Sequence, residues 1–284
     1  MKKINKLGIL LVVLVLTTMS IFAGCQNAEE STGNANGNNG EDSEVTTKLD
    51  EIKEAGKIVL GTAADYPPYE FHKEIDGKDS IVGFDIEIAN EIAEDIGVEL
   101  EIKDMKFEGL LAALQTGKID FIIAGMVPTA ERAENVDFSK IYYNADQSFL
   151  TKSGKGSEYK TIEDLAGLTV GAQKATTQAD IAKDKIDSGE VKLLAKITDL
   201  VLALKNDKVD GVVLVKPVAE AYAKANDDLE VAEVSLGKED GVSIAVGKGN
   251  SALLESVNNT IDKLLEENKI DKFIKDATKL SEEN

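Results

Sequence analysis

Two stretches of the chain repeat the same pattern of apolar and polar residues. The first, LLAALQTGKIDFIIAG, covers 110–125, and the second, LVLALKNDKVDGVVLV, covers 200–215. Each has the spacing of an amphipathic helix, then a polar turn, then a short β-branched run that is typical of a buried parallel strand. The two stretches match at Leu110/Leu200, Ala113/Ala203, Leu114/Leu204, Lys118/Lys208 and Asp120/Asp210. Either two such units resemble each other by chance, or the chain contains two similar α/β lobes.

Strands and helices alternate along the rest of the chain. The patterns predict strands at 57–63, 98–102 and 167–172 and helices at 84–97 and 176–185. Asp85 is available as the N-cap of the helix at 84–97. Such repetition predicts an α/β fold of mainly parallel sheets flanked by helices. Ligands of open sheets of this type bind beyond the carboxyl ends of the strands.

The beginning of the chain resembles a bacterial lipoprotein signal. A basic lead and an apolar run end at Ala23, Gly24 and Cys25, the single cysteine. We therefore expect a signal peptide at 1–24, lipidation of Cys25 and a flexible acidic Asn- and Gly-rich tether at 25–45, which holds almost no large apolar residue. An ordinary cleaved signal and a retained helix are the alternatives, but the apolar run is short for a membrane span.

Charge and composition exclude several classes of function. The formal charge is −20, and removal of residues 1–24 takes away three lysines and no acid, which leaves −23. This charge argues against nucleic acids and anionic lipid surfaces as partners. His72 is the single histidine and Cys25 is expected to carry a lipid, which excludes a typical zinc or copper cluster. His72 also follows a predicted loop, so no convincing Ser-His or Cys-His dyad can be assembled. We expect no metal and no cofactor.

Arg132 is the only arginine of the chain, and lysine supplies every other basic residue. The flat guanidinium fork matches the two oxygens of a carboxylate, which a lysine ammonium does not. Arg132 follows the strand that ends near Gly125, in the first turn of a helix with Thr129 as its N-cap. An anion bound there would meet backbone N–H groups, the helix dipole and the guanidinium together. The alternative is an ordinary exposed side chain.

The second lobe offers a similar arrangement of strand and helix. The segment GAQKATTQ places Gln173, Thr176 and Thr177 where the strand at 167–172 leads into its helix. Helix capping is the more common role of such threonines, and it is compatible with contact to a ligand.

The order of several motifs resembles the family 3 extracellular solute-binding proteins, the polar amino acid receptors of ABC importers. These motifs are GTAADYPPYEF, GFDIEIA, LLAALQTGKIDFIIAGM, TAER, VDFSKIYY and VGAQKATTQ. The resemblance runs in register over 52–280 and implies a two-lobed venus-flytrap fold of the type II periplasmic-binding-protein kind. It implies a first lobe from 46–143 and 241–284 and a second lobe from 144–240, with hinge strands near 143–148 and 235–241.

The resemblance also implies a role for individual residues of the first lobe. Arg132 matches the arginine that clamps the ligand α-carboxylate. Tyr66 and Phe107 match the aromatic residues that line two walls of the ligand site. Gly125 matches a backbone contact to the ligand amino group, and Val127 matches a Ser or Thr of which only the amide is kept here.

Other matched residues lie in the second lobe or carry acidic groups. Thr177 matches a second-lobe contact to the carboxylate, with Thr176 beside it, and Gln173 stands where the family varies its recognition of the ligand side chain. Asp65 and Glu70 flank Tyr66 and are candidates to bind a cationic ligand.

The chain departs from the family at Ala63, Ala175 and Val215. Val215 stands where the family places the acid that receives the ligand ammonium, so we expect this residue to lie in the cleft. Two readings stay open. In the first, another acid binds the ligand ammonium, and the candidates are Asp65, Glu70 and Asp85. In the second, the ligand is a less polar carboxylate without an α-amino group.

The resemblance implies a substrate-binding lipoprotein of an ABC importer rather than an enzyme. Such a protein captures a small amino acid or related carboxylate and delivers it to the permease. We expect a monomer, anchored by its lipid to the outer face of a Gram-positive cell membrane. The alternatives are a sensor or adhesin on the same fold and a dehydratase-type enzyme, because dehydratases exist on this fold.

Overall fold

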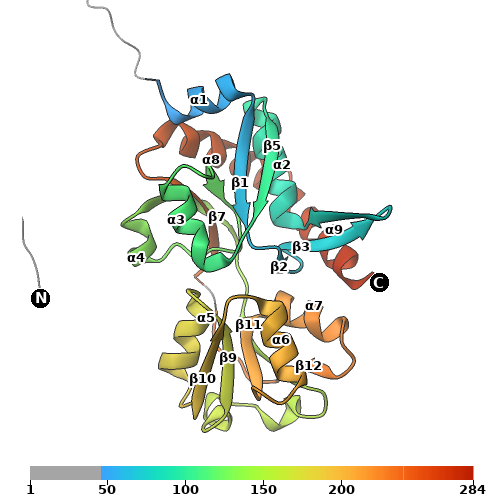
Figure 1. Ribbon diagram of the computed structural model, residues 1–284. Coiled ribbons are helices and arrows are strands. Elements are labelled where there is room, and N and C mark those ends of the chain that lie inside the picture. Colours follow the sequence, from blue (N-terminus) through green and yellow to red (C-terminus); the bar gives the residue numbers. More distant parts are fainter. Residues whose placement is uncertain (1–45, 239, 284) are drawn as a thin grey trace, which may run out of the picture. The chain divides into compact units, whose positions relative to one another are not determined.

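The computed structural model describes residues 46–238 and 240–283. The predicted signal peptide, Cys25 and the tether lie outside these residues. Two five-stranded sheets organise the described chain (Figure 1). The first sheet has the order β5 (Glu99–Asp104), β1 (Lys57–Thr62), β6 (Phe121–Ile122), β13 (Val242–Gly247) and β7 (Val136–Tyr143). The second sheet has the order β10 (Glu190–Leu194), β9 (Thr169–Gln173), β11 (Gly211–Val215), β8 (Gln147–Lys152) and β12 (Leu229–Val231).

We call each sheet with its helices a lobe. A small third sheet, β2 (Asp65–Tyr66), β3 (Glu70–Ile75) and β4 (Lys78–Val82), extends the first lobe. The helices of the first lobe are α1 (Lys48–Ala55), α2 (Phe84–Ile96), α3 (Leu110–Gln115), α4 (Ala130–Ala133), α8 (Ser251–Glu266) and α9 (Lys269–Glu282). Those of the second are α5 (Thr177–Asp180), α6 (Ile197–Lys205) and α7 (Lys216–Lys224), with a π-helical continuation of α5 at Ile181–Lys185. Short 3-10 turns cover Phe107–Gly109, Gly156–Glu158 and Ile162–Leu165.

The α/β fold predicted from the sequence is confirmed, but the sheets are less parallel than expected. In the first sheet β5, β1 and β6 pair in parallel, while β13 runs antiparallel to both of its neighbours. The second sheet has the same arrangement, with β8 as the antiparallel strand. β8 is the first strand after the chain leaves the first sheet, and β13 is the first strand after it returns, so neither is fed by the helical crossover that keeps neighbours parallel.

The internal repeat corresponds to equivalent units of the two lobes. Asp120 precedes β6, and its backbone N–H and carboxylate bond to the carbonyl and N–H of Val59 on β1, both at 2.8 Å. Asp210 precedes β11 and makes the same pair of bonds to Thr169, at 2.8 and 2.7 Å. Each aspartate thus fixes the start of one strand against its parallel neighbour, which explains why both repeats keep this residue.

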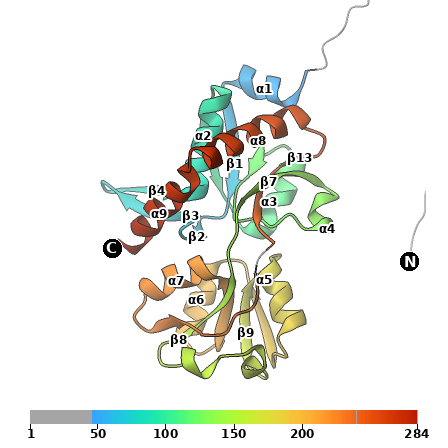
Figure 2. The ribbon, with the colours of Figure 1, turned by 180° about the vertical axis from the view of Figure 1, so that it is seen from behind.

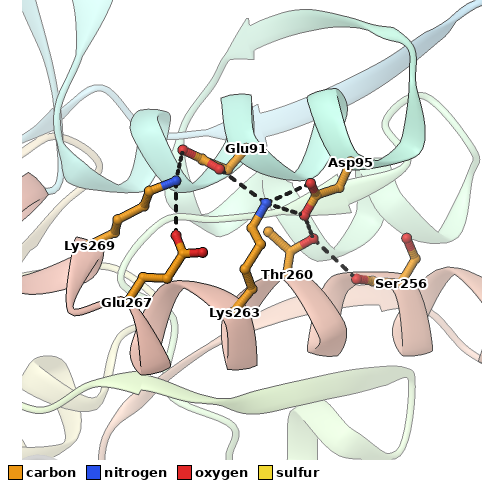
Figure 3. A network of polar contacts seen from close by, with 7 residues as sticks. All are labelled: Glu91, Asp95, Ser256, Thr260, Lys263, Glu267 and Lys269. Atoms are coloured by element: carbon orange, nitrogen blue, oxygen red, sulfur yellow. Dashed lines mark hydrogen bonds and ion pairs between the residues drawn. The ribbon is translucent and has the colours of Figure 1, made fainter.

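The C-terminal helices return to the first lobe and pack on α2 (Figure 2). Lys263 of α8 joins Asp95 of α2 at 2.6 Å and Glu91 of α2 at 3.3 Å (Figure 3). Thr260 donates to the same Asp95, and Lys269 bonds Glu91. This network lies at the edge of an apolar interface that includes Ile92, Val257 and Ile261. The end of the chain is therefore an integral part of the first lobe.

Helix α2 begins one residue earlier than its predicted cap. Gly83 is the N-cap, with φ 134°, and a Cβ at this position would lie 2.0 Å from the carbonyl oxygen of Tyr69. The prediction that Asp85 caps α2 is wrong. Asp85 is fully buried in the first turn and bonds to groups outside the helix.

Two segments carry the chain between the sheets, and they lie side by side. Asp146 and Lys238 form an antiparallel bridge, and the N–H of Gln147 donates to the carbonyl of Gly237 at 2.7 Å. These residues fall within or beside the ranges expected to act as hinge strands, and their hinge motion stays a prediction. No helix among the described residues has the length and apolar character needed to cross a membrane.

Candidate ligand-binding site

Arg132 lies where the sequence predicted, in a short helix after the end of β6. The hydroxyl of Thr129 caps α4 and accepts from the N–H of Arg132 at 3.3 Å. The guanidinium carbon lies 5.4 Å from the ring centre of Phe107. Nη1 donates to the carbonyl of Val127 at 2.7 Å, and Nη2 donates to the carbonyl of Ala175 in the second lobe at 2.8 Å. The cap and the aromatic ring therefore hold the fork between the two lobes.

A cavity between the lobes begins at this guanidinium. Every predicted ligand contact except Val215 lines it. The lining residues are Ala63, Asp65, Tyr66, Glu70, Phe107, Ala124, Gly125, Val127, Arg132, Gln173, Thr176, Thr177 and Gln178. The expectation that Val215 lies in the cleft does not fit this lining, because Val215 is 1% exposed and belongs to an apolar cluster with Leu214 and Val218. The direct contact of the other residues with a ligand stays a prediction.

Tyr66 and Gly125 form one wall of the cavity. Gly125 has φ +52°, and a Cβ there would lie 3.1 Å from Cε1 of Tyr66. Only glycine combines this backbone conformation with so close a ring. Tyr69 packs behind Tyr66 at a ring distance of 5.2 Å and is fully buried, as Phe71 nearly is. Tyr69 and Phe71 are therefore buried aromatic residues of the first lobe.

Glu70 of the first lobe lines the cavity, whereas Asp85, which lies next to it, does not. Asp85 accepts from the N–H of Gly125 at 3.0 Å and from the hydroxyl of Tyr142 at 2.9 Å. Burial raises the pKa of the Asp85 carboxyl to about 6, although these hydrogen bonds act to lower it. Glu70 is 1% exposed, and burial, followed by the charge of Asp85, holds its pKa well above the usual range. No described residue hydrogen-bonds to Oε2 of Glu70.

The second lobe contributes neutral side chains to the cavity. The hydroxyl of Thr176 caps α5 by accepting from the N–H of Ala179 at 3.2 Å, and it donates to the carbonyl of Gln173 at 2.7 Å. The capping interpretation of Thr176 is thus correct. The hydroxyl of Thr177 makes a 3.5 Å contact with Oε1 of Gln178, which is long for a hydrogen bond. Gln173 donates to the carbonyl of Ala195 at 3.1 Å, which orients its amide.

Sequence reasoning missed Gln178 and did not commit to Glu70. Gln178 donates to Oε1 of Gln147 at 3.1 Å, so it connects the cavity wall to β8. Its position directly after Thr177 in the first turn of α5 was the available signal. Glu70 was a candidate to bind a cationic ligand, but nothing local in YPPYEF shows that this glutamate is buried.

Comparison with known proteins agrees with the fold. The sequence profile of the bacterial extracellular solute-binding proteins, family 3, matches residues 58–277. The chain belongs to this family. It is 36% identical over 223 residues to the arginine-binding extracellular protein ArtP of Bacillus subtilis (strain 168), which covers 77% of this chain and 85% of that protein. Over 281 residues it is 32% identical to the ABC transporter glutamine-binding protein GlnH of the same strain, with 97% of each chain covered.

Solved structures of family members have the same architecture. The amino acid ABC transporter substrate-binding protein AbpA of Streptococcus pneumoniae, solved with bound L-arginine, superposes with a TM-score of 0.79. It is 38% identical, and the match covers 83% of this chain and all of that one. The family and two-lobed fold predicted from the sequence are therefore confirmed, and this solute-binding protein has amino acid-binding relatives in ABC transport.

We predict that Ala175 carries backbone strain. Its φ is +61°, in the left-handed region that costs a non-glycine residue about 1 kcal/mol. Ala175→Gly should therefore leave the free energy of unfolding unchanged or raise it by up to about 1 kcal/mol. The control Ala166→Gly, at an exposed alanine with φ −62°, should lower it by about 0.5–1 kcal/mol. Denaturant titration measures both, and equal losses would show that Ala175 is unstrained.

We also predict that the buried acids make stability depend on pH. A carboxyl group whose pKa is raised by folding stabilises the folded state below its unfolded pKa, and this contribution is lost as the pH rises through the folded value. For Asp85 this window runs from 3.8 to about 6, and for Glu70 it extends higher. The midpoint of thermal unfolding of the ligand-free protein should therefore fall as the pH rises from about 4 through about 6 and above.

Glu70→Gln removes one titrating group, so the midpoint of thermal unfolding should fall less steeply as the pH rises. Glu74→Gln, at an exposed position of the same strand β3, is the matched control and should behave as the unmodified protein does. An unchanged pH dependence in Glu70→Gln would show that Glu70 does not contribute.

Proposed function

We propose that this solute-binding protein captures a cationic amino acid, with L-arginine as the first candidate, and delivers it to the permease of an ABC importer. One observation carries the proposal. The cavity is lined by the Arg132 guanidinium and by the buried carboxyl group of Glu70, whose Oε2 accepts from no described residue, which suits a ligand with both charges. The relatives ArtP and AbpA support the choice of arginine, while GlnH supports an amino acid with a neutral amide.

Arg132 is the group that would receive the ligand carboxylate. Its two terminal nitrogens donate to the carbonyls of Val127 and Ala175, so the plane of the fork is fixed by both lobes. A carboxylate beside it would also meet backbone N–H groups near Val127 and at the start of α5, where Thr177 lies. Charge-assisted bonds of this kind are about twice as strong as neutral ones.

The acidic groups would receive the positive charge of the ligand. A buried carboxylate without a partner is costly, and a cation within hydrogen-bond distance removes that cost. Glu70 fits this description at Oε2, to which no described residue hydrogen-bonds, while Asp85 lies next to it and hydrogen-bonds to the same carboxyl group. A neutral amide such as that of glutamine would compensate the charge less well. This argument favours arginine over glutamine for this chain.

The aromatic walls would hold the aliphatic part of the ligand. Tyr66 and Phe107 both line the cavity, and Phe107 already stacks under the Arg132 guanidinium. Aromatic faces attract cations as well as apolar carbons. The amide of Gln173 lies on the same cavity and is oriented by Ala195, so it is suited to a polar contact with the ligand side chain.

The signal-like start of the chain supports an anchored protein. Lipidation of Cys25 and a tether over 26–44 would keep the two lobes at the outer face of the cell membrane, within reach of a permease. The relatives are components of ABC transport, which supports the permease as partner.

We expect L-arginine to raise the midpoint of thermal unfolding in a concentration-dependent way, because it binds the folded state. Arg132→Lys should weaken its binding by about 1.5–3 kcal/mol, since a point charge cannot replace the bidentate fork. This corresponds to a roughly ten- to hundredfold higher dissociation constant by calorimetry.

Agmatine, which is arginine without the carboxylate, is the control ligand for this substitution. Its affinity should be weak in both proteins and should change little with Arg132→Lys. Absence of any shift with arginine would refute the proposed ligand, and equal arginine affinities would refute the role of Arg132.

Lipidation predicts that Cys25→Ser releases the protein from the membrane. After detergent phase separation, the unmodified protein should enter the detergent phase and the variant should enter the aqueous phase. Ser20→Ala, at a residue inside the signal, is the control and should partition as the unmodified protein does. Unchanged attachment of Cys25→Ser would argue against a lipid anchor.

A further inference from the structure

Asp65 is a residue of the first lobe whose polar groups contact the second lobe. It lies on β2, and its Oδ2 accepts from the backbone N–H of Ile197 at 2.7 Å. Its own carbonyl accepts from the hydroxyl of Tyr222 at 2.7 Å. Ile197 begins α6 and Tyr222 belongs to α7, so both donors belong to the second lobe. These bonds exist only while the two lobes are together.

The carboxylate of Asp65 takes the place of a missing helix cap. Helix α6 has Lys196 at its N-cap position, and this side chain makes no capping hydrogen bond. The first N–H groups of a helix need an acceptor, and an anion there also interacts favourably with the helix dipole. Asp65 supplies the acceptor from the opposite lobe. Opening of the lobes would leave this end of α6 to water.

The second carboxylate oxygen of Asp65 has no such partner. Oδ1 is buried, and no described residue hydrogen-bonds to it. Asp65 lines the ligand cavity and also a neighbouring cavity that Asp104 and Lys196 border. Burial raises the pKa of Asp65 to about 6, with Asp104 acting in the same direction and Lys196 against it. The contact with α6 therefore leaves the charge of Asp65 only partly compensated.

We propose that Asp65 is a positioning residue that makes closure of the lobes depend on a positive charge in the ligand. Oδ2 caps α6, and Oδ1 accepts from the ligand cation, so the carboxylate is fully satisfied only when the lobes are closed over a cationic ligand. A neutral ligand of the same shape leaves Oδ1 unpaired and makes closure less favourable. This inference rests on the proposed cationic ligand.

The role of Asp65 differs from that of Glu70. Glu70 belongs to the core of the first lobe, and none of its described contacts reaches the second lobe, so it would attract a cation whether the lobes are open or closed. Asp65 links the charge of the ligand to the contact between lobes. Its removal should therefore change mainly the rate at which a bound ligand leaves, because dissociation requires opening.

Two substitutions separate the cap from the charge. Asp65→Asn keeps an oxygen that can accept from Ile197 but removes the charge, whereas Asp65→Ala removes both. L-arginine and L-citrulline, its isostere with a neutral side chain, are the probes. In Asp65→Asn the dissociation rate of arginine should rise roughly tenfold while that of citrulline stays the same or falls. In Asp65→Ala both rates should rise. Asp199→Asn, at an exposed acid in the first turn of α6, is the control and should change neither.

The source of the positive charge is tested with a third probe. 5-Guanidinopentanoate is arginine without its α-ammonium. If it keeps the Asp65→Asn effect, the guanidinium is the partner of Oδ1. If it loses the effect, the α-ammonium is the partner, and citrulline, which also has an α-ammonium, should then respond to Asp65→Asn as arginine does. An arginine dissociation rate that Asp65→Asn leaves unchanged overturns the proposal.

A readout without ligand separates this proposal from the proposed function. Hydrogen exchange of the Ile197 amide, followed by NMR in the ligand-free protein, should be slow in the unmodified protein and in Asp65→Asn and fast in Asp65→Ala. Equal exchange in all three overturns the cap. If arginine does not bind the unmodified protein, the proposed ligand is wrong, and so is the proposed dependence of closure on the charge of that ligand. The exchange result still decides whether Asp65 caps α6.

Discussion

The hydrogen bond from the Gly125 N–H to the buried carboxylate of Asp85 holds the binding site in place. It joins the loop after β6 to the first turn of α2 at 3.0 Å, and the hydroxyl of Tyr142 on β7 donates a second hydrogen bond to the same carboxylate. The same loop leads to Thr129 and Arg132. The hydrogen bond between Gly125 and Asp85 therefore also helps to position the guanidinium. An apolar residue in place of Asp85 would remove the acceptor of the partly buried Gly125 N–H, and with it a hydrogen bond to a charged group.

Local sequence patterns predicted the parts of this site that depend on neighbouring residues. The strand before Gly125 and the cap at Thr129 follow from β-branched runs and capping preferences, and both predictions are confirmed. The role of Asp85 was missed, because its partner Gly125 lies 40 positions along the chain. The burial of Glu70 was missed for the same kind of reason, because nothing in the neighbouring sequence shows it. Family resemblance placed Val215 in the cleft, but the lining residues do not include it.

The two crossings of the chain explain why each sheet contains one antiparallel strand. β8 enters the second sheet and β13 re-enters the first, and each occupies the fourth place in its sheet. The segments that lead to them meet at the bridge between Asp146 and Lys238. Because the lobes are joined by two adjacent extended segments, we expect small changes in a few backbone dihedral angles to move one lobe against the other. Such a motion would leave the core of each lobe intact.

The distribution of charge suggests an order of events for binding. Every charged side chain that lines the cavity, Asp65, Glu70 and Arg132, belongs to the first lobe, whereas the second lobe contributes amides, hydroxyls and backbone groups. A ligand with a carboxylate and a cation would therefore obtain its charged contacts from the first lobe alone. The carbonyl of Ala175 and the N–H of Ile197 connect the second lobe to Arg132 and Asp65 of the first lobe, and these contacts would form only on closure. Attraction would then be electrostatic and precede closure, while retention would depend on the contacts that closure adds.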